Sequence, residues 1–187
     1  MQWKFKITYG EIMKKYLLVV AVFAFLIGCQ KSADDNQTNP AITELNQNKK
    51  LAIDLSNKAL IGVGTYDETG GIKKIVVTPG KKGLVLFGPY LPLQEGSYAV
   101  KFYFDLSGPA NVVAATVDFT VIDKARNVVE VLKPTDVIFT ASKIEQAVEL
   151  SFKVPSNKNN NLLYEFRVTS SGAGSIVVKQ ILLTKNN

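Results

Sequence analysis

Six side chains in the later part of the sequence are candidates for binding chemistry, because they combine aromatic rings with charged groups. A sugar offers an apolar ring face that stacks on an aromatic ring, and hydroxyls that bind carboxylates and guanidinium groups. The candidates are Tyr66, Asp67, Tyr90, Tyr103, Glu165 and Arg167. The simpler alternative for each is an ordinary polar position on a solvated sheet.

Few residues are available for catalysis. The 187-residue chain has no histidine and a single cysteine, Cys29, which removes Ser-His-Asp and Cys-His mechanisms and any internal disulfide. A glycosidase needs only two carboxylates. Those available are Asp67, Asp105, Asp118 and Glu165. Their spacing identifies no pair, and Asp67 and Glu68 lack the spacing of a calcium loop. We therefore expect a protein that is not an enzyme and that has no cofactor.

The charge of the chain does not indicate nucleic-acid binding. The net charge is +6. The residues before Cys29 contain four lysines and one glutamate, so half of the net positive charge belongs to them. The other charges are dispersed, whereas a nucleic-acid site needs basic side chains clustered on one face. We expect no nucleic-acid partner.

The residues before Cys29 have the form of a secretory signal. Lys14 and Lys15 precede a short apolar run at residues 16 to 28, which is shorter than the roughly 20 residues of a spanning helix. The sequence Leu26-Ile27-Gly28-Cys29 resembles the lipobox of bacterial lipoproteins. The resemblance implies cleavage before Cys29 and lipidation of its thiol. Residues 1 to 12 would then precede the true start, Met13; the alternative is a plain signal peptide.

The residue after Cys29 bears on location. It is Gln30 and not Asp, and the resemblance then implies the outer membrane rather than the inner one. Residues 29 to 50 are rich in Asn, Gln, Asp and Lys, so we expect a lipidated flexible tether. Within residues 41 to 60 the spacing of apolar residues also allows a turn or two of helix. The boundaries are then 1–28 for the upstream residues and signal, 29–50 for the tether and 51–187 for the domain.

The sequence pattern of the domain predicts an all-β fold. In "SYAVKFYFD" every second residue is apolar from Tyr98 to Phe104, and "LYEFRVTS" alternates in the same way, with Glu165 and Arg167 on the solvated face. Gly, Pro and Asn turns separate such segments. The expected strands are 61–66, 73–78, 83–87, 97–106, 112–122, 127–132, 136–140, 146–154, 163–170 and 175–184. Their number and spacing predict an antiparallel two-sheet β-sandwich.

The segment "KGLVLFGPYLPLQEGSYAVKFYF" carries a second resemblance. Together with the later "LLYEFRV" and "IVVKQILL", it is similar to jelly-roll, galactose-binding-like carbohydrate-binding domains, including those attached to bacterial glycosyltransferases. The similarity covers about residues 83 to 183 and implies glycan binding. For Gly88, Pro89 and Tyr90 the alternative is a corner that only shapes the fold.

These observations favour a membrane-anchored envelope lipoprotein with a noncatalytic sandwich that binds glycan. A cluster of Tyr103, Glu165 and Arg167 around one concavity would support this. The alternative is a structural or adhesive lipoprotein that binds another envelope protein, for which a long apolar strand edge would speak. A carboxylate pair across a cleft would indicate an enzyme instead.

Overall fold

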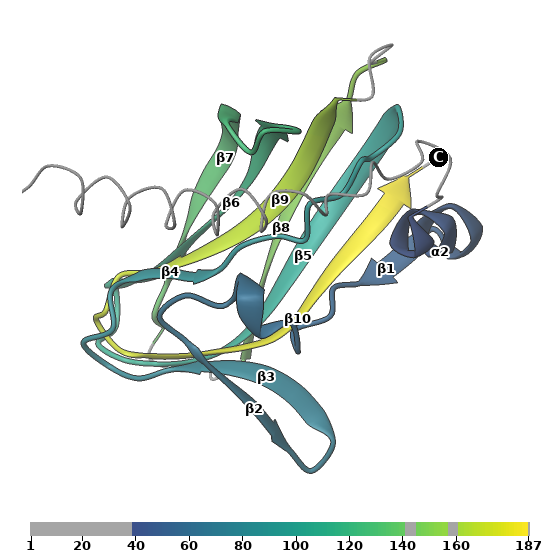
Figure 1. Cartoon of the computed structure of the whole chain (residues 1–187). Coiled ribbons are helices and arrows are strands. Elements are labelled where there is room, and N and C mark those ends of the chain that lie inside the picture. Colours follow the sequence, from purple (N-terminus) through teal and green to yellow (C-terminus); the bar gives the residue numbers. More distant parts are fainter. Residues whose placement is uncertain (1–38, 141–144, 157–160, 187) are drawn as a thin grey trace, which may run out of the picture. The chain divides into compact units, whose positions relative to one another are not determined.

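The computed structural model describes residues 39–140, 145–156 and 161–186 (Figure 1). Cys29, the expected signal and the first part of the expected tether, residues 29 to 38, lie outside this part of the chain. The elements in chain order are α2 (Pro40–Asn48), β1 (Lys50–Ala52), the 3-10 helix η1 (Lys58–Leu60), β2 (Thr65–Thr69), β3 (Ile72–Val77), β4 (Gly83–Leu86), β5 (Gly96–Ser107), β6 (Val113–Asp123), β7 (Val128–Ile138), β8 (Glu145–Val154), β9 (Leu162–Ser170) and β10 (Ser175–Asn186).

The strands form two antiparallel sheets. One has the order β2-β3-β10-β5-β8, with β1 also paired to β10, and the other has the order β4-β9-β6-β7. Two four-stranded layers therefore face each other, one made of β3, β10, β5 and β8 and the other of β4, β9, β6 and β7. This strand order is that of a jelly roll. The predicted all-β sandwich and its jelly-roll topology are confirmed.

The core lies between the sheets, where the alternation places it. Tyr98, Phe102 and Phe104 of β5 and Phe166 of β9 are all buried, as the sequence predicts. Aromatic rings from both sheets meet at Phe152 of β8, whose ring centroid is 4.2 Å from that of Phe119 and 6.2 Å from that of Phe166. Contacts of this kind join the two sheets into one core.

Two strand predictions are wrong. The segments 127–132 and 136–140 form one strand, β7. Pro134 cannot donate to a ladder, but β7 is at an edge, where a missing donor is tolerated. Lys133 has a positive φ of 49° where the register with β6 shifts, so a bulge absorbs the irregularity. The strand expected at 61–66 is only an isolated bridge at Ile61, and β2 begins at Thr65.

The end of the expected tether is part of the folded domain. Asn39 caps α2, its Oδ1 accepting from the backbone N–H of Ala41 at 3.0 Å, and Pro40 opens the helix. Leu45 is buried in the core, and β1 pairs with the end of β10, where Lys50 lies opposite Thr184. The compact unit therefore begins at Asn39 rather than at residue 51. The polar composition concealed this because one buried leucine is enough to dock a short helix.

Candidate functional site

The structure distributes the six candidate residues over three parts of the sandwich. Tyr66 and Asp67 lie in β2, and Tyr103 lies on the outer side of the β5 sheet. Tyr90, Glu165 and Arg167 lie at the outer side of the β9 sheet. The cluster of Tyr103, Glu165 and Arg167 that would have supported glycan binding does not form, because β5 and β9 belong to different sheets whose inner sides face each other.

The two residues of β2 are engaged locally. They lie in a hairpin strand and not in the expected loop. The Tyr66 hydroxyl donates to Glu68 at 2.6 Å, and this hydrogen bond is the main reason that the pKa of Tyr66 is raised to about 12. Asp67 accepts from Thr69 at 2.7 Å and pairs with Lys74 at 3.1 Å, which lowers the pKa of its carboxyl group. These groups satisfy one another across the hairpin and do not converge on a ligand.

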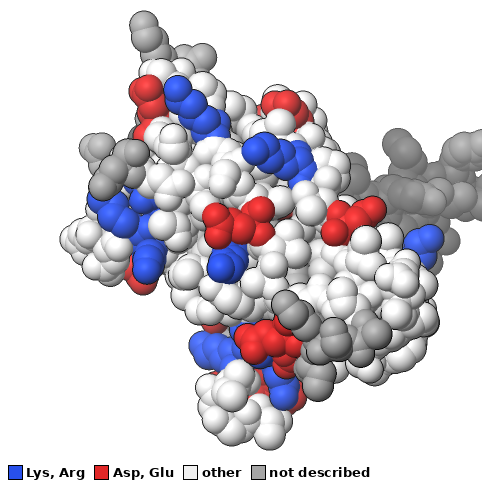
Figure 2. All heavy atoms as spheres, turned by 180° about the vertical axis from the view of Figure 1, so that it is seen from behind, with Lys and Arg blue, Asp and Glu red and all other residues white. Residues whose placement is uncertain are grey.

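Tyr103 belongs to a solvated outer face with paired charges. The ammonium of Lys101 lies 5.5 Å from the centroid of its ring. Next to it, Lys179 pairs with Asp105 at 3.1 Å and with Glu145 at 3.4 Å. The view from behind shows acidic and basic side chains interspersed, with no broad area of one sign (Figure 2). This is the ordinary polar surface that the simpler alternative describes.

The other sheet carries a denser polar cluster on its outer side, which we call the β9 face and define as Tyr90, Asp118, Thr120, Glu165 and Arg167. In the register of β6 and β9, Asp118 lies opposite Arg167 and Thr120 opposite Glu165. Arg167 Nε donates to Asp118 Oδ1 at 2.7 Å, and the Thr120 hydroxyl donates to the same oxygen at 3.2 Å. Three of the six predicted residues therefore meet on one face.

The burial of Glu165 on the β9 face is unexpected. It points away from the core but is only 7% exposed, so its prediction as a solvated residue is wrong. Alternation indicates the side of a sheet that a residue faces, not how crowded that side is. Glu165 makes no hydrogen bond to another described residue. Burial raises the pKa of its carboxyl group, the charge of Asp118 raises it further, and Arg167 partly opposes both.

The turn at Gly88 brings Tyr90 to this face. Beyond the end of β4 the chain continues along β9: the N–H of Phe166 donates to the carbonyl of Gly88 at 3.2 Å, and Leu91 and Tyr164 exchange two hydrogen bonds of 3.0 and 2.9 Å. Leu91 is buried in the core and Tyr90 is partly exposed. The Gly88–Pro89 peptide is cis. The GPY corner therefore shapes the fold and also places an aromatic ring beside Glu165.

An arginine from the turn between β6 and β7 contacts the Tyr90 ring. The guanidinium carbon of Arg126 lies 4.8 Å from the ring centroid, within range of a cation–π interaction. Arg126 adopts a positive φ of 65° in the turn between β6 and β7. Asp123 closes this turn by accepting from the backbone and the side chain of Asn127 at 2.8 and 2.9 Å. The pKa of Asp123 is lowered by these bonds.

No pattern in the sequence indicates Thr120 or Arg126 as site residues, and Asp118 stands out only as one of several carboxylates. Their roles depend on β6 being the neighbour of β9. The described residues contain no group of three or more His, Cys, Asp or Glu placed to hold a metal ion. Within the same ranges no helix has the length and apolarity needed to span a membrane.

Comparisons with known proteins give likenesses at the level of structure only. No protein-family model matches the chain, and no curated protein matches it in sequence. Similar solved structures include the C-terminal family 6 carbohydrate-binding module of a laminarinase from Zobellia galactanivorans, with a TM-score of 0.49 and 12% identity over 73% of this chain and 99% of that one.

Two further solved structures are similar to the chain, and their names describe different kinds of protein. Accessory secretory proteins of Streptococcus pneumoniae give a TM-score of 0.48 and 15% identity, over 72% of this chain and 92% of that one. A family 15 xylan-binding module gives a TM-score of 0.47 and 11% identity, over 74% of this chain and 97% of that one. The jelly-roll assignment of this chain rests on its own strand order.

Proposed function

We propose that this protein is a lipid-anchored envelope protein whose jelly roll binds glycan at the β9 face. The observation that carries the proposal is the meeting of Tyr90, Glu165 and the Arg167–Asp118 pair on one side of one sheet. Glu165 makes no hydrogen bond to another described residue, yet among these residues no fully buried side-chain oxygen lacks a partner, so its carboxylate oxygens are still reached by solvent. A ligand hydroxyl could therefore donate to Glu165 in place of water.

The β9 face offers the polar groups that a polyhydroxylated ligand needs. A guanidinium has five N–H donors, and Arg167 uses its Nε–H on Asp118. Its terminal nitrogens have no hydrogen-bond partner among the described residues and can donate to hydroxyl oxygens. Glu165 can accept from the same hydroxyls, while the Tyr90 ring, held by Arg126, provides an apolar surface for a sugar ring.

The binding test is a panel of neutral and acidic oligosaccharides probed with the full-length chain. The chain is solubilised in a detergent without a sugar headgroup, so that the detergent does not compete. We expect saturable binding that falls at least tenfold in Glu165→Gln and in Arg167→Lys. Tyr103→Ala, on the opposite outer face, is the matched control and leaves binding unchanged. Folded protein that binds no oligosaccharide, or binding lost only in Tyr103→Ala, overturns the proposal.

The anchor is proposed from the lipobox-like sequence Leu26-Ile27-Gly28-Cys29. The outer-membrane location is proposed from Gln30, which stands where an Asp would favour the inner membrane. Several acyl chains on one residue give stable membrane attachment. We expect Cys29→Ala to abolish acylation and to move the protein from the outer-membrane fraction to the soluble fraction, as measured by fractionation and mass spectrometry. Unchanged acylation and membrane partitioning of this variant would contradict the proposal.

A second candidate function is binding of another envelope protein by strand addition at β7. This strand is at the edge of its sheet, and its Val128 and Val129 are each 58% exposed. The bulge at Lys133 leaves the first half of the edge open to an added strand. A photo-crosslinking residue at Val129 should then give one discrete product in intact cells, and the same residue at exposed Ile72 should give none. Equal labelling at both sites would contradict this function.

A further inference from the structure

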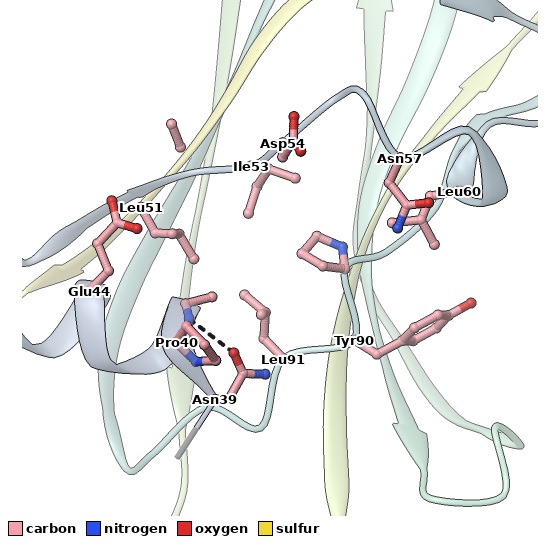
Figure 3. Close-up of a pocket in the computed structure, with 13 residues that line it drawn as sticks. Asn39, Pro40, Glu44, Leu51, Ile53, Asp54, Asn57, Leu60, Tyr90 and Leu91 are labelled. Atoms are coloured by element: carbon pink, nitrogen blue, oxygen red, sulfur yellow. Dashed lines mark hydrogen bonds between the residues drawn. The ribbon is translucent and has the colours of Figure 1, made fainter. Parts of the chain in front are cut away.

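A pocket of about 400 Å³ lies beside Tyr90, at the side of the sandwich where α2 and β1 approach the GPY corner (Figure 3). Its volume falls within the usual range for small-ligand sites, about 300–1,000 Å³. Leu51, Ile53 and Leu91 contribute an apolar lining and are nearly fully buried. We call it the α2 pocket.

Two asparagines supply oriented donors to the α2 pocket. Asn39 caps α2 and Asn57 caps η1, where its Oδ1 accepts from the N–H of Ala59 at 3.2 Å. Because each side chain uses its oxygen as the cap, its amide nitrogen is left to donate. Neither amide nitrogen has a hydrogen-bond partner among the described residues. In Figure 3 the oxygen of Asn39 is turned toward the helix and its nitrogen toward Leu91.

The charged lining of the pocket is acidic. Glu44 and Asp54 line it, and its lining residues include no Lys or Arg. Asp54 accepts from the Ser56 hydroxyl and pairs with Lys73 at 3.2 Å, and these bonds, first those from Ser56, lower the pKa of its carboxyl group. Glu44 makes no hydrogen bond to another described residue. A ligand here meets carboxylate acceptors that suit hydroxyl donors. Lys73 offsets the charge of Asp54, but Glu44 stays negative and the lining has no cation that would attract a carboxylate of the ligand.

Tyr90 joins the α2 pocket to the β9 face. It lines the pocket, and the charge of Glu165 contributes to the raised pKa of its hydroxyl, after burial. We propose that the α2 pocket binds one neutral sugar ring of a glycan that also contacts the β9 face, and that it discriminates against uronic acids. The inference rests on the proposed glycan-binding function and adds to it a preference for uncharged rings.

The test compares neutral rings with their carboxylate counterparts. Glucose and galactose are titrated against glucuronic and galacturonic acid on the full-length chain by ligand-observed NMR, in the same sugar-free detergent. We expect at least one neutral sugar to bind at least fivefold more tightly than its uronic acid. Asn57→Asp keeps the cap oxygen of η1 but replaces the donor with a charge, and should weaken this binding at least fivefold. Asn111→Asp, the same change at an exposed site, is the control.

The outcomes separate the two proposals. If oligosaccharides bind and Glu165→Gln weakens them, while Asn57→Asp leaves all binding unchanged, the pocket inference is overturned and the β9 face stands. Equal binding of neutral and acidic rings also overturns the pocket inference. If the folded wild-type chain binds neither monosaccharides nor oligosaccharides, the proposed function fails and the pocket inference fails with it.

Discussion

The outer faces of the two sheets carry the same kinds of side chains in different surroundings. On the β5 sheet, Lys179 and Asp105 pair at 3.1 Å with side chains that are 31% and 33% exposed. On the β9 sheet, Arg167 and Asp118 pair at 2.7 Å with side chains that are 21% and 7% exposed. Both pairs occupy outward positions of alternating strands. The sequence pattern is therefore the same, and only the degree of burial distinguishes an ordinary surface from a candidate site.

Burial changes the energetic meaning of such a pair. An exposed ion pair contributes about 0–1 kcal/mol, because water competes for both partners and screens their charges. A buried charge needs its partner, and its removal costs several times more. Keeping Asp118, Glu165 and Arg167 on the same crowded face therefore has a desolvation cost, and the proposed ligand would offset part of it. This contrast between the faces can be tested by substitution.

The largest effects should be equal on the inner sides of the two sheets. Phe102 of β5 and Phe166 of β9 are both fully buried, and Phe→Ala in such a core costs about 3–5 kcal/mol. We expect each substitution to lower the free energy of unfolding by this amount in urea denaturation followed by circular dichroism. A near-neutral effect at either position would show that its sheet does not contribute to a common core.

A smaller but unequal effect should appear on the outer sides. Arg167→Met keeps an unbranched apolar side chain but leaves Asp118 without its charged partner, so we expect a loss of about 2–3 kcal/mol. Lys179→Met removes the corresponding cation from the β5 sheet and should cost less than about 1 kcal/mol. Both values come from the same denaturation experiment. Equal losses would remove the distinction between the two faces.

The smallest effect concerns Glu165 and depends on pH. Its pKa is raised in the folded protein above the ordinary 4.5, so its favourable contribution is complete below the unfolded pKa and is lost as the pH rises through the folded pKa. Glu165→Gln should therefore raise the melting temperature at pH 7. The gain should shrink as the pH falls and disappear near pH 4. A difference that does not vary with pH would show that the carboxyl group is not destabilised by burial.

Most strands and their buried sides could be predicted, because apolar and polar residues alternate along each strand and this pattern is local in the sequence. From Tyr98 to Phe104 the pattern identifies the buried residues correctly. The meeting of Tyr90, Glu165 and Arg167 on one side was not predicted as a group, because it depends on which strands are neighbours. Only the pairing of β9 with β6 brings Asp118 to Arg167, and the hydrogen bonds of Gly88 and Leu91 to β9 carry Tyr90 along that strand.

The helix α2 was expected only as a turn or two somewhere within residues 41 to 60, and the structure shows nine helical residues at Pro40–Asn48. Its sequence is polar and short, and its stability comes from docking rather than from composition. Leu45 is its one buried residue, so its apolar period is imperfect and does not indicate its length. Asn39 and Lys49 cap the two ends of α2, but Asn and Lys are also common in flexible tethers and so do not by themselves indicate a helix. The α2 pocket, which is built in part by this helix, could not be foreseen for the same reason.

The attachment of β1 has a mechanical consequence. Strand β1 is three residues long and lies along β10 on the same side as β3, next to the last strand residues of the chain. A pulling force applied to the chain ahead of Asn39 reaches α2 and β1 before it reaches the two four-stranded layers. Fully extended, residues 40 to 52 span at most about 45 Å, and their release breaks no pairing between the strands of the two four-stranded layers. We therefore expect this segment to detach under load before the sandwich unfolds.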